Sequence, residues 1–323
     1  MPILLDTSEG LAHWVWQTYG VRPDRMRCIA RLSCEIHRIG RAEHAAEDLS
    51  LRIYPRGAGG TADIEAEMAW LAGLGDAGCR VPTPRAGVDG RLVQCRPDGR
   101  AAVLLSWVSG RILDAGLRPL HLRRVGRLVG MMHRVAADLT AAHRLASTRQ
   151  ADGPDLDSWA EGRRPRTPHL PAPVHQRVER AAARLRGELA CLSRAPSGWG
   201  FVHGDLHLWN LLFQAREAGA IDFSDCGWGP QALDLAAPLQ YLKFPLAGHR
   251  DHSALFQQFR DELFEGYAEC RPLPSDVGAQ VQACLELRAI NTIEWILDCW
   301  PRIDARPWGP AFLARAGDFF DAD

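Results

Sequence analysis

One stretch in the second half of the chain constrains its fold and chemistry more than any other. Asp205 and Asn210 lie five residues apart, and Asp222 follows Asn210 by twelve residues. Two apolar runs, 211–213 and 220–223, are separated by a turn signal and predict a β-hairpin. This hairpin brings Asn210 and Asp222 to one end. Three side chains that can bind a metal or act as a base are therefore expected to lie close together.

The spacing is that of a phosphoryl-transfer site. The stretch matches the kinase catalytic loop, H-R-D-L-x-x-x-N, at His203, Asp205, Leu206 and Asn210. Gly204 stands in place of the arginine, and Asp222-Phe223-Ser224 takes the place of D-F-G. In kinases the loop aspartate accepts the proton of the attacking hydroxyl, and the asparagine and second aspartate hold Mg²⁺ on the phosphates. Asp205 is thus the candidate base, and Asn210 and Asp222 are the candidate metal ligands.

These residues resemble those of the aminoglycoside phosphotransferase and choline kinase-like superfamily. The continuation, 226–230 and Asp234-Leu235-Ala236, is most similar to its bacterial branch that includes stress-response and homoserine kinase-like enzymes. The resemblance extends over nearly the whole chain. It implies a bilobal protein kinase-like fold of the α+β class, ATP and Mg²⁺ as cofactors bound between the lobes, and a hydroxyl acceptor bound against helices of the second lobe.

The order of expected elements supports two lobes. The first hundred residues predict an α+β region with helices at 11–19 and 64–74 and strands at 26–33, 36–40, 48–54 and 101–108. After Gly110 the periodicity is mainly helical, with a long proline-rich loop at 150–174. We therefore expect a small sheet-containing N-lobe at 1–107 that covers the nucleotide. A larger helical C-lobe at 108–323 carries the catalytic loop, the metal ligands and the acceptor site.

Lysine is almost absent from the chain. Of the 38 basic residues, 37 are arginine and one is Lys243, which has no glycine-rich loop before it. This excludes a Walker A phosphate loop. The phosphate-binding lysine of kinases must also be replaced, and Arg52 on the third strand is the candidate. Glu67 falls on the apolar arc of the 64–74 helix, where a carboxylate is costly unless paired, so we expect it to pair with Arg52.

Other nucleotide contacts follow from the resemblance. No glycine-rich loop lies between the first two strands, and Ile36 stands where the related branch often has asparagine. The hydroxyl of Ser33 and nearby backbone N–H groups are the available donors to phosphate. Adenine is expected to hydrogen-bond the backbone between Ser106 and Val108, where the lobes connect.

Composition sets limits on partners and location. The net charge is −1, so the chain has no global affinity for nucleic acid or an anionic membrane. It contains no apolar run long enough to span a bilayer and no signal-peptide pattern at its start. Nine scattered cysteines without a C-x-x-C motif indicate reduced thiols rather than a zinc site. We expect a cytoplasmic protein; the sequence carries no signal of its oligomeric state.

Several alternatives remain open at this point. The acceptor can be a small molecule, including an amine-bearing one such as an aminoglycoside, amino alcohol or homoserine-like metabolite, or a protein serine or threonine. Residues 251–323 carry 13 acidic and 6 basic side chains, a surplus that could attract an amine. A nucleotide-binding pseudokinase is a second hypothesis. A metallohydrolase using His203 and His207 is a third.

Single residues near the motif also have structural interpretations. Asp234 is expected to cap the helix that begins at Leu235, and His133 is expected to be a satisfied residue of the core or of the lobe interface. Trp209 and Trp228 flank the site and either stack on a substrate or fill the core.

Overall fold

Nine segments of the chain can be described from a computed structural model. They are residues 7–31, 34–40, 48–57, 60–113, 116–151, 153–191, 197–243, 252–300 and 308–320. The chain divides into two compact units. Unit 1 comprises Met1–Leu113, Arg134–Arg149 and Asn210–Ser224, and unit 2 comprises Asp114–His133, Gln150–Trp209 and Asp225–Asp323.

Unit 1 is built on an antiparallel sheet with strand order β1-β2-β3-β6-β4, in which β5 also pairs with β6. The strands are β1 (Arg25–Arg31), β2 (Glu35–Gly40), β3 (Leu49–Ile53), β4 (Pro84–Arg85), β5 (Val93–Cys95) and β6 (Ala101–Ser106). A separate hairpin pairs β8 (Leu211–Gln214) with β9 (Glu217–Ala220), with Leu211 opposite Ala220. The expected strands and the expected hairpin are therefore present.

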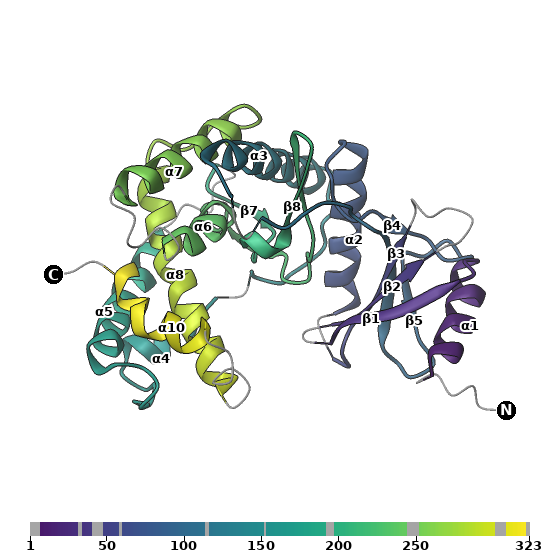
Figure 1. Ribbon diagram of the computed structural model, residues 1–323, viewed down its shortest axis with the longest axis horizontal. Coiled ribbons are helices and arrows are strands. Elements are labelled where there is room, and N and C mark those ends of the chain that lie inside the picture. The colour runs from purple at the N-terminus through teal and green to yellow at the C-terminus, as the bar shows by residue number, and fades with distance from the viewer. Residues whose placement is uncertain are drawn as a thin grey trace. The chain divides into compact units, whose positions relative to one another are not determined.

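Two helices lie on opposite sides of this sheet (Figure 1). The first, α1 (Ser8–Tyr19), begins where the Thr7 hydroxyl accepts the Gly10 N–H at 3.1 Å, and it ends at Gly20 with φ 67°. The second, α2 (Thr61–Asp76), begins where Asp63 accepts the Gly60 N–H at 3.2 Å. Both termini use the capping chemistry that short polar side chains and glycine supply.

Side chains of β3 alternate between the face of the sheet that packs on α1 and the face that meets α2. Successive side chains of a strand point to opposite faces. Leu49, Leu51 and Ile53 pack with α1 in one buried cluster. Arg52 points to the other face, where it meets Glu67 of α2. One short strand thus separates an apolar core from a charged pair.

Unit 2 is mainly helical, as expected. Its elements include α4 (Leu156–Ala160), α5 (Ala172–Cys191), α6 (Ala232–Gln240), α7 (His252–Ala268), α8 (Val277–Asp298), α10 (Trp308–Arg315) and the 3-10 turn η4 (Ala316–Phe319), with β7 (Trp199–Val202) paired to β10 (Gly227–Pro230). Helix α3 (Pro119–Ala141) begins in unit 2 and continues into unit 1. Within the described residues, no helix combines the length and apolarity needed to cross a bilayer.

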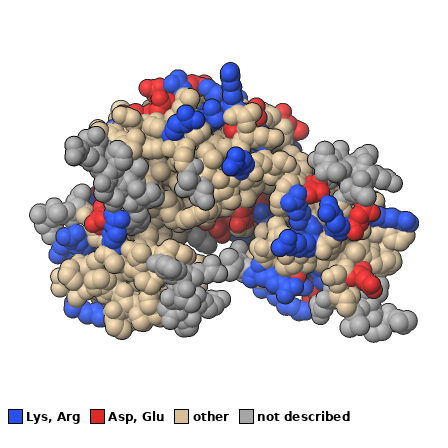
Figure 2. Space-filling model, in the orientation of Figure 1, with Lys and Arg blue, Asp and Glu red and all other residues tan. Residues whose placement is uncertain are grey.

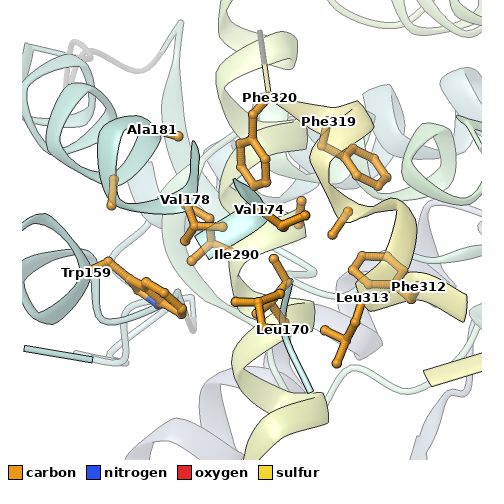
Figure 3. Packing of buried hydrophobic residues seen from close by; sticks show 14 of the residues in the cluster. Trp159, Leu170, Val174, Val178, Ala181, Ile290, Phe312, Leu313, Phe319 and Phe320 are labelled. Carbon is orange, nitrogen blue, oxygen red and sulfur yellow. The ribbon is translucent and has the colours of Figure 1, made fainter. Parts of the chain in front are cut away.

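The core of unit 2 forms around α5 and α8. Side chains from α4, α10 and η4 join it, including Trp159, Phe312 and Phe319 (Figure 3). The expectation of one loop over 150–174 is wrong here, because α4 lies inside that range. Asp155 caps this helix by accepting the Ser158 N–H at 2.9 Å, and buried Trp159 donates to Glu294 at 2.8 Å.

Two glycines let α3 and α7 approach closely within unit 2. A Cβ at Gly126 would lie 1.9 Å from the Leu263 carbonyl oxygen, and one at Gly266 would lie 1.9 Å from the Arg123 carbonyl oxygen. Both obstacles are backbone atoms that cannot rotate away. The helix contact therefore depends on the absence of side chains at these two positions.

We predict that Gly126→Ala lowers the free energy of unfolding by about 1–3 kcal/mol, because overpacking forces the backbones apart. Gly187→Ala is the matched control, since Gly187 lies in α5 with nothing within 4 Å of an added Cβ. The control should raise stability by about 0.5–1 kcal/mol. Urea denaturation followed by circular dichroism measures both. Equal effects of the two substitutions would contradict the close-packing interpretation.

Candidate active site

The charged centre of unit 1 is a buried ion pair. Arg52 Nη1 donates to Glu67 Oε1 at 2.5 Å, and the Tyr54 hydroxyl donates to Glu67 Oε2 at 2.8 Å. Arg52 and Glu67 are 4% and 1% exposed. The expected pairing of strand arginine and helix glutamate is present. Tyr54 was not anticipated, although its place two residues after Arg52 on the same strand face was readable from the sequence.

The pair has strong electrostatic consequences. Burial alone would lower the pKa of Arg52, but the negative charge of Glu67 outweighs it and the pKa stands well above its usual value. Arg52 therefore stays charged under all ordinary conditions. A buried charge whose partner is removed costs several kcal/mol, so the two residues hold each other in place.

Asp222 lies beside this pair, at the end of the β8–β9 hairpin. Its Oδ1 is 3.7 Å from Arg52 Nη2 and accepts the Ser224 hydroxyl at 3.0 Å. The backbone of Asp222 has φ 63°, a left-handed conformation that aspartate tolerates better than most residues. The next residue, Phe223, is fully buried against Trp70 of α2, with ring centroids 5.3 Å apart.

The hairpin brings Asn210 to the same end. The Ile221 N–H donates to the Asn210 carbonyl oxygen at 3.0 Å, which links the start of β8 to the residue before Asp222. Asn210 is buried, whereas the Asp222 side chain is 38% exposed. An amide oxygen and an accessible carboxylate are hard donors of the kind that Mg²⁺ prefers. The donor chemistry of unit 1 therefore fits a magnesium ion.

The expected base-binding segment is partly occupied by internal bonds. The Ser106 N–H donates to the Thr83 carbonyl oxygen at 2.9 Å, and its hydroxyl accepts the Thr83 N–H at 2.8 Å. The Trp107 N–H donates to the Asp48 carbonyl oxygen at 3.0 Å. These bonds occupy the N–H groups of Ser106 and Trp107, and the contact of adenine with the backbone between Ser106 and Val108 stays a prediction. Ser33, the expected phosphate donor, lies outside the described residues.

In unit 2, Asp205 is held by an arginine that was not anticipated. Arg288 of α8 donates from Nη2 to Asp205 Oδ1 at 2.8 Å and from Nη1 to the Gly204 carbonyl oxygen at 2.9 Å. Its Nε donates to Gln240 of α6 at 2.9 Å. Arg288 is 6% exposed and Asp205 is about one-third exposed. The available signal was a charged residue among Leu287, Ala289 and Ile290.

This contact sets the protonation state of Asp205. Burial would raise the pKa of Asp205, but the guanidinium of Arg288 and the imidazole of His207 hold it below its usual value. Asp205 is therefore a carboxylate at neutral pH, able to accept a hydrogen bond. It is a weaker base than a free carboxylate because its charge is already shared.

Asp234 does not cap a helix, contrary to expectation. It lies inside the first turn of α6, fully buried, and accepts the N–H groups of His203 at 2.8 Å and Gly204 at 3.0 Å. Its Oδ2 also lies 3.1 Å from His133 Nε2. Asp234 therefore fixes the backbone of the loop that carries Asp205. His133, which also contacts Tyr267, is a satisfied core residue as expected.

The departure from kinases at Gly204 has a steric cause. Its φ is 83°, and a Cβ there would lie 2.6 Å from the Asp225 carbonyl oxygen. No arginine fits this backbone. The bond from Arg288 instead supplies a guanidinium to the loop from another part of unit 2.

The histidines of the motif do not form a metal cluster. His203 Nδ1 accepts the Asp205 N–H at 3.3 Å, while His207 Nε2 lies 3.4 Å from Asp205 Oδ2. Among the described residues, three potential ligand side chains converge within 4.8 Å at Cys28, Glu35 and His37 and not around Asp205. These contacts favour a scaffolding role for the histidines over the metallohydrolase hypothesis.

The flanking tryptophans differ. Trp209 is 51% exposed and makes edge contacts with His207 and Tyr241, so its ring is accessible beside the loop. Trp228 packs edge-on against buried Phe201. A stacking role is therefore compatible with Trp209, and core packing is the better description of Trp228.

Within the described part of residues 251–323, several acidic side chains pair with arginines of unit 2. Arg123 of α3 bonds Glu265 of α7 and Glu269, which follows the end of α7, both at 2.8 Å, and Arg127 also bonds Glu269. Acidic and basic side chains accordingly alternate over α3 and α7 (Figure 2). Glu286 and Glu294 of α8 bond arginines at 184 and 164. Among the described residues, these acidic side chains are therefore paired with arginines.

Known proteins resemble this chain in sequence. A model described as the phosphotransferase enzyme family (APH) matches residues 38–273. A protein of Deinococcus radiodurans, described as uncharacterized, is 31% identical over 233 residues, covering 70% of this chain and 64% of its own. The amicoumacin kinase of Bacillus subtilis is 26% identical over 209 residues, covering 63% of this chain and 60% of its own. The match thus spans about three-fifths of each relative's length.

Solved structures share the fold. An amicoumacin kinase in complex with AMP-PNP, Ca²⁺ and Ami superposes with a TM-score of 0.79 at 19% identity, covering 98% of this chain and 96% of the other. A microcompartment-associated aminopropanol kinase superposes with a TM-score of 0.72 at 21% identity, covering 96% and 95%. The expected protein kinase-like fold of the α+β class is confirmed.

The buried pair in unit 1 leads to a stability prediction. Glu67→Gln leaves the Arg52 charge without its partner, so we expect the free energy of unfolding to fall by about 3–5 kcal/mol. Glu65→Gln on the exposed side of the same helix is the matched control and should change stability by less than about 0.5 kcal/mol. Denaturant titration measures both variants. A Glu67→Gln protein as stable as the control would show that the pair is not needed for the fold.

Proposed function

Because the chain belongs to the phosphotransferase enzyme family, we propose that it transfers the γ-phosphoryl group of ATP to a hydroxyl group of a small molecule. The observation that carries the proposal is the buried Arg52–Glu67 pair with the Asp222 carboxylate 3.7 Å from Arg52. A permanently charged guanidinium beside an accessible carboxylate is suited to hold phosphate together with its metal ion.

In unit 1, charged side chains bind the phosphates of the nucleotide and backbone groups bind its base. Arg52 contacts the phosphates, and Glu67 keeps its guanidinium in position. Asn210 and Asp222 hold Mg²⁺, which supplies positive charge to the phosphate oxygens during transfer. The base hydrogen-bonds the backbone at Val108. The divalent ion and nucleotide analogue in the amicoumacin kinase complex support this assignment.

In unit 2, Asp205 orients the acceptor. Phosphoryl transfer passes through a loose transition state, so the protein mainly positions the nucleophile. A carboxylate whose pKa is held low by Arg288 stays ionised and accepts the hydrogen bond of the acceptor hydroxyl. The proton moves to Asp205 only as the new phosphate ester forms. Gly204, Asp234 and Arg288 keep the loop in the shape this requires.

The acceptor we propose is an amine-bearing alcohol. Similar proteins are named for amicoumacin and aminopropanol, which favours a small molecule over a protein serine or threonine. The exposed ring of Trp209, in the same loop as Asp205, can bind an ammonium group through its π face. An ATP-using enzyme with nine free cysteines suits a reducing compartment such as the cytoplasm.

The proposal predicts acceptor-dependent release of ADP. Purified protein with ATP and Mg²⁺ should release ADP faster with at least one member of a panel of aminoglycosides, amino alcohols and amine-free sugars. Asp205→Asn should lower kcat by about 10²–10⁴-fold, with ATP affinity by calorimetry kept. Asp261→Asn, an exposed carboxylate on α7, is the control and should retain full turnover. Undiminished kcat in Asp205→Asn would contradict the assigned role.

The Arg288 contact predicts a change in pH dependence. Arg288 lowers the pKa of Asp205, so replacing it raises that pKa, and the ionised form is lost at higher pH as the solution is acidified. The acid limb of the kcat profile of Arg288→Gln should therefore move to higher pH. The exposed-surface control, Arg186→Gln, should keep the wild-type profile. A simple fall in kcat at all pH values, with the acid limb unmoved, would indicate a purely structural role.

A further inference from the structure

A cluster of metal-binding side chains lies on the α1 side of the unit 1 sheet, opposite Arg52. Cys28 of β1 pairs directly with His37 of β2, and His37 pairs with Leu51 of β3. Directly opposed residues of antiparallel strands share a face. Glu35, two residues before His37, lies on that face as well. The cluster is therefore separate from the proposed nucleotide site.

The donor atoms of the three side chains already converge. One ligand atom each from Cys28, Glu35 and His37 lies within 4.8 Å of the others. The closest approach is 2.8 Å, between His37 Nε2 and Glu35 Oε1. In a tetrahedral zinc site, bonds of 2.0–2.3 Å place ligand atoms about 3.3–3.8 Å apart. Reaching that geometry requires the 2.8 Å contact between His37 Nε2 and Glu35 Oε1 to lengthen.

A cation already lies against this cluster. Arg31 Nε donates to Cys28 Sγ at 3.3 Å, and its Nη2 is 3.8 Å from Glu35 Oε1. The Arg31 side chain is 73% exposed, so moving it into solvent costs little. The Arg31 guanidinium therefore marks the place where Cys28 and Glu35 bind a positive charge.

Access and charge balance also suit an ion. The three side chains line a pocket of about 510 Å³, which gives solvent a route to the donors. Arg100 donates to Glu35 Oε2 at 3.0 Å, so Oε1, which now contacts His37 Nε2, is the oxygen on the side of the other donors. Arg96 and Arg100 are both bonded to Asp98, at 3.2 and 2.9 Å. With Arg31 in solvent, Glu35 and Asp98 match these two arginines, and a Cys28 thiolate leaves a net negative charge.

We propose that Cys28, Glu35 and His37 bind a zinc ion, with water as the fourth ligand and Arg31 displaced into solvent. Thiolate, imidazole and carboxylate together favour Zn²⁺ over Mg²⁺, which prefers oxygen donors. Binding releases the thiol proton of Cys28 to the buffer. The ion cross-links β1 and β2 of the sheet that carries Arg52, and it stabilises unit 1.

Metal titration of the reduced, metal-free full-length protein tests the site. Co²⁺ should bind with one equivalent, giving a thiolate-to-cobalt charge-transfer band and tetrahedral visible bands, and Zn²⁺ should displace it. Cys28→Ser should abolish the charge-transfer band, and His37→Ala should weaken Zn²⁺ binding at least about 10-fold. Cys95→Ser, which removes an exposed thiol of β5, is the control and should bind normally.

Further variants keep the proposal testable if a ligand substitution prevents folding. Arg31→Ala removes the competing cation from an exposed position, so Zn²⁺ should bind more tightly and raise Tm more than in wild type. Weaker binding in Arg31→Ala would overturn the proposal. So would a Co²⁺ complex without thiolate charge transfer, or Zn²⁺ affinity equal in wild type and Cys28→Ser.

Discussion

The buried ion pair between Arg52 and Glu67 is the interaction on which unit 1 depends. Neither charge is tolerable alone in the interior, so β3 and α2 must meet where the two side chains lie. Asp222 then lies beside a fixed positive charge, and buried Phe223 anchors its segment against Trp70. The contact that holds β3 and α2 together is thus also the one we propose to bind phosphate.

In unit 2, buried charges also find partners, and they do so around the loop that carries Asp205. Asp234 and Arg288 are buried charges that find partners in the backbone of residues 203–204 and in Asp205. Asp234 belongs to α6 and Arg288 to α8, so these two helices hold the loop in place. The side chain that would orient the acceptor is therefore held by residues that take no part in the transfer.

Local patterns predicted much of this arrangement. The hairpin that joins Asn210 to Asp222 follows from two apolar runs and a turn, and Glu67 was identified as an apolar-face carboxylate in need of a partner. Residues missed were those whose partners are far away in sequence. Arg288 lies 83 residues from Asp205, and Glu294 lies 139 residues from the segment it holds at α4. Asp234 was misassigned because a buried carboxylate and a helix cap share the same local sequence.

The sequence by itself determined the hairpin that joins Asn210 to Asp222, the order of elements and the pairing of Arg52 with Glu67, because these depend on residue type and short spacings. Tertiary structure decided which charges meet. It placed Arg288 against Asp205 and Asp234 against the backbone of residues 203–204. It also paired acidic side chains of α7 and α8 with arginines of α3 and α5. It also brought Cys28 opposite His37, which no cysteine spacing indicated. Strand register and helix packing set these contacts, and both arise only when distant segments share one interior.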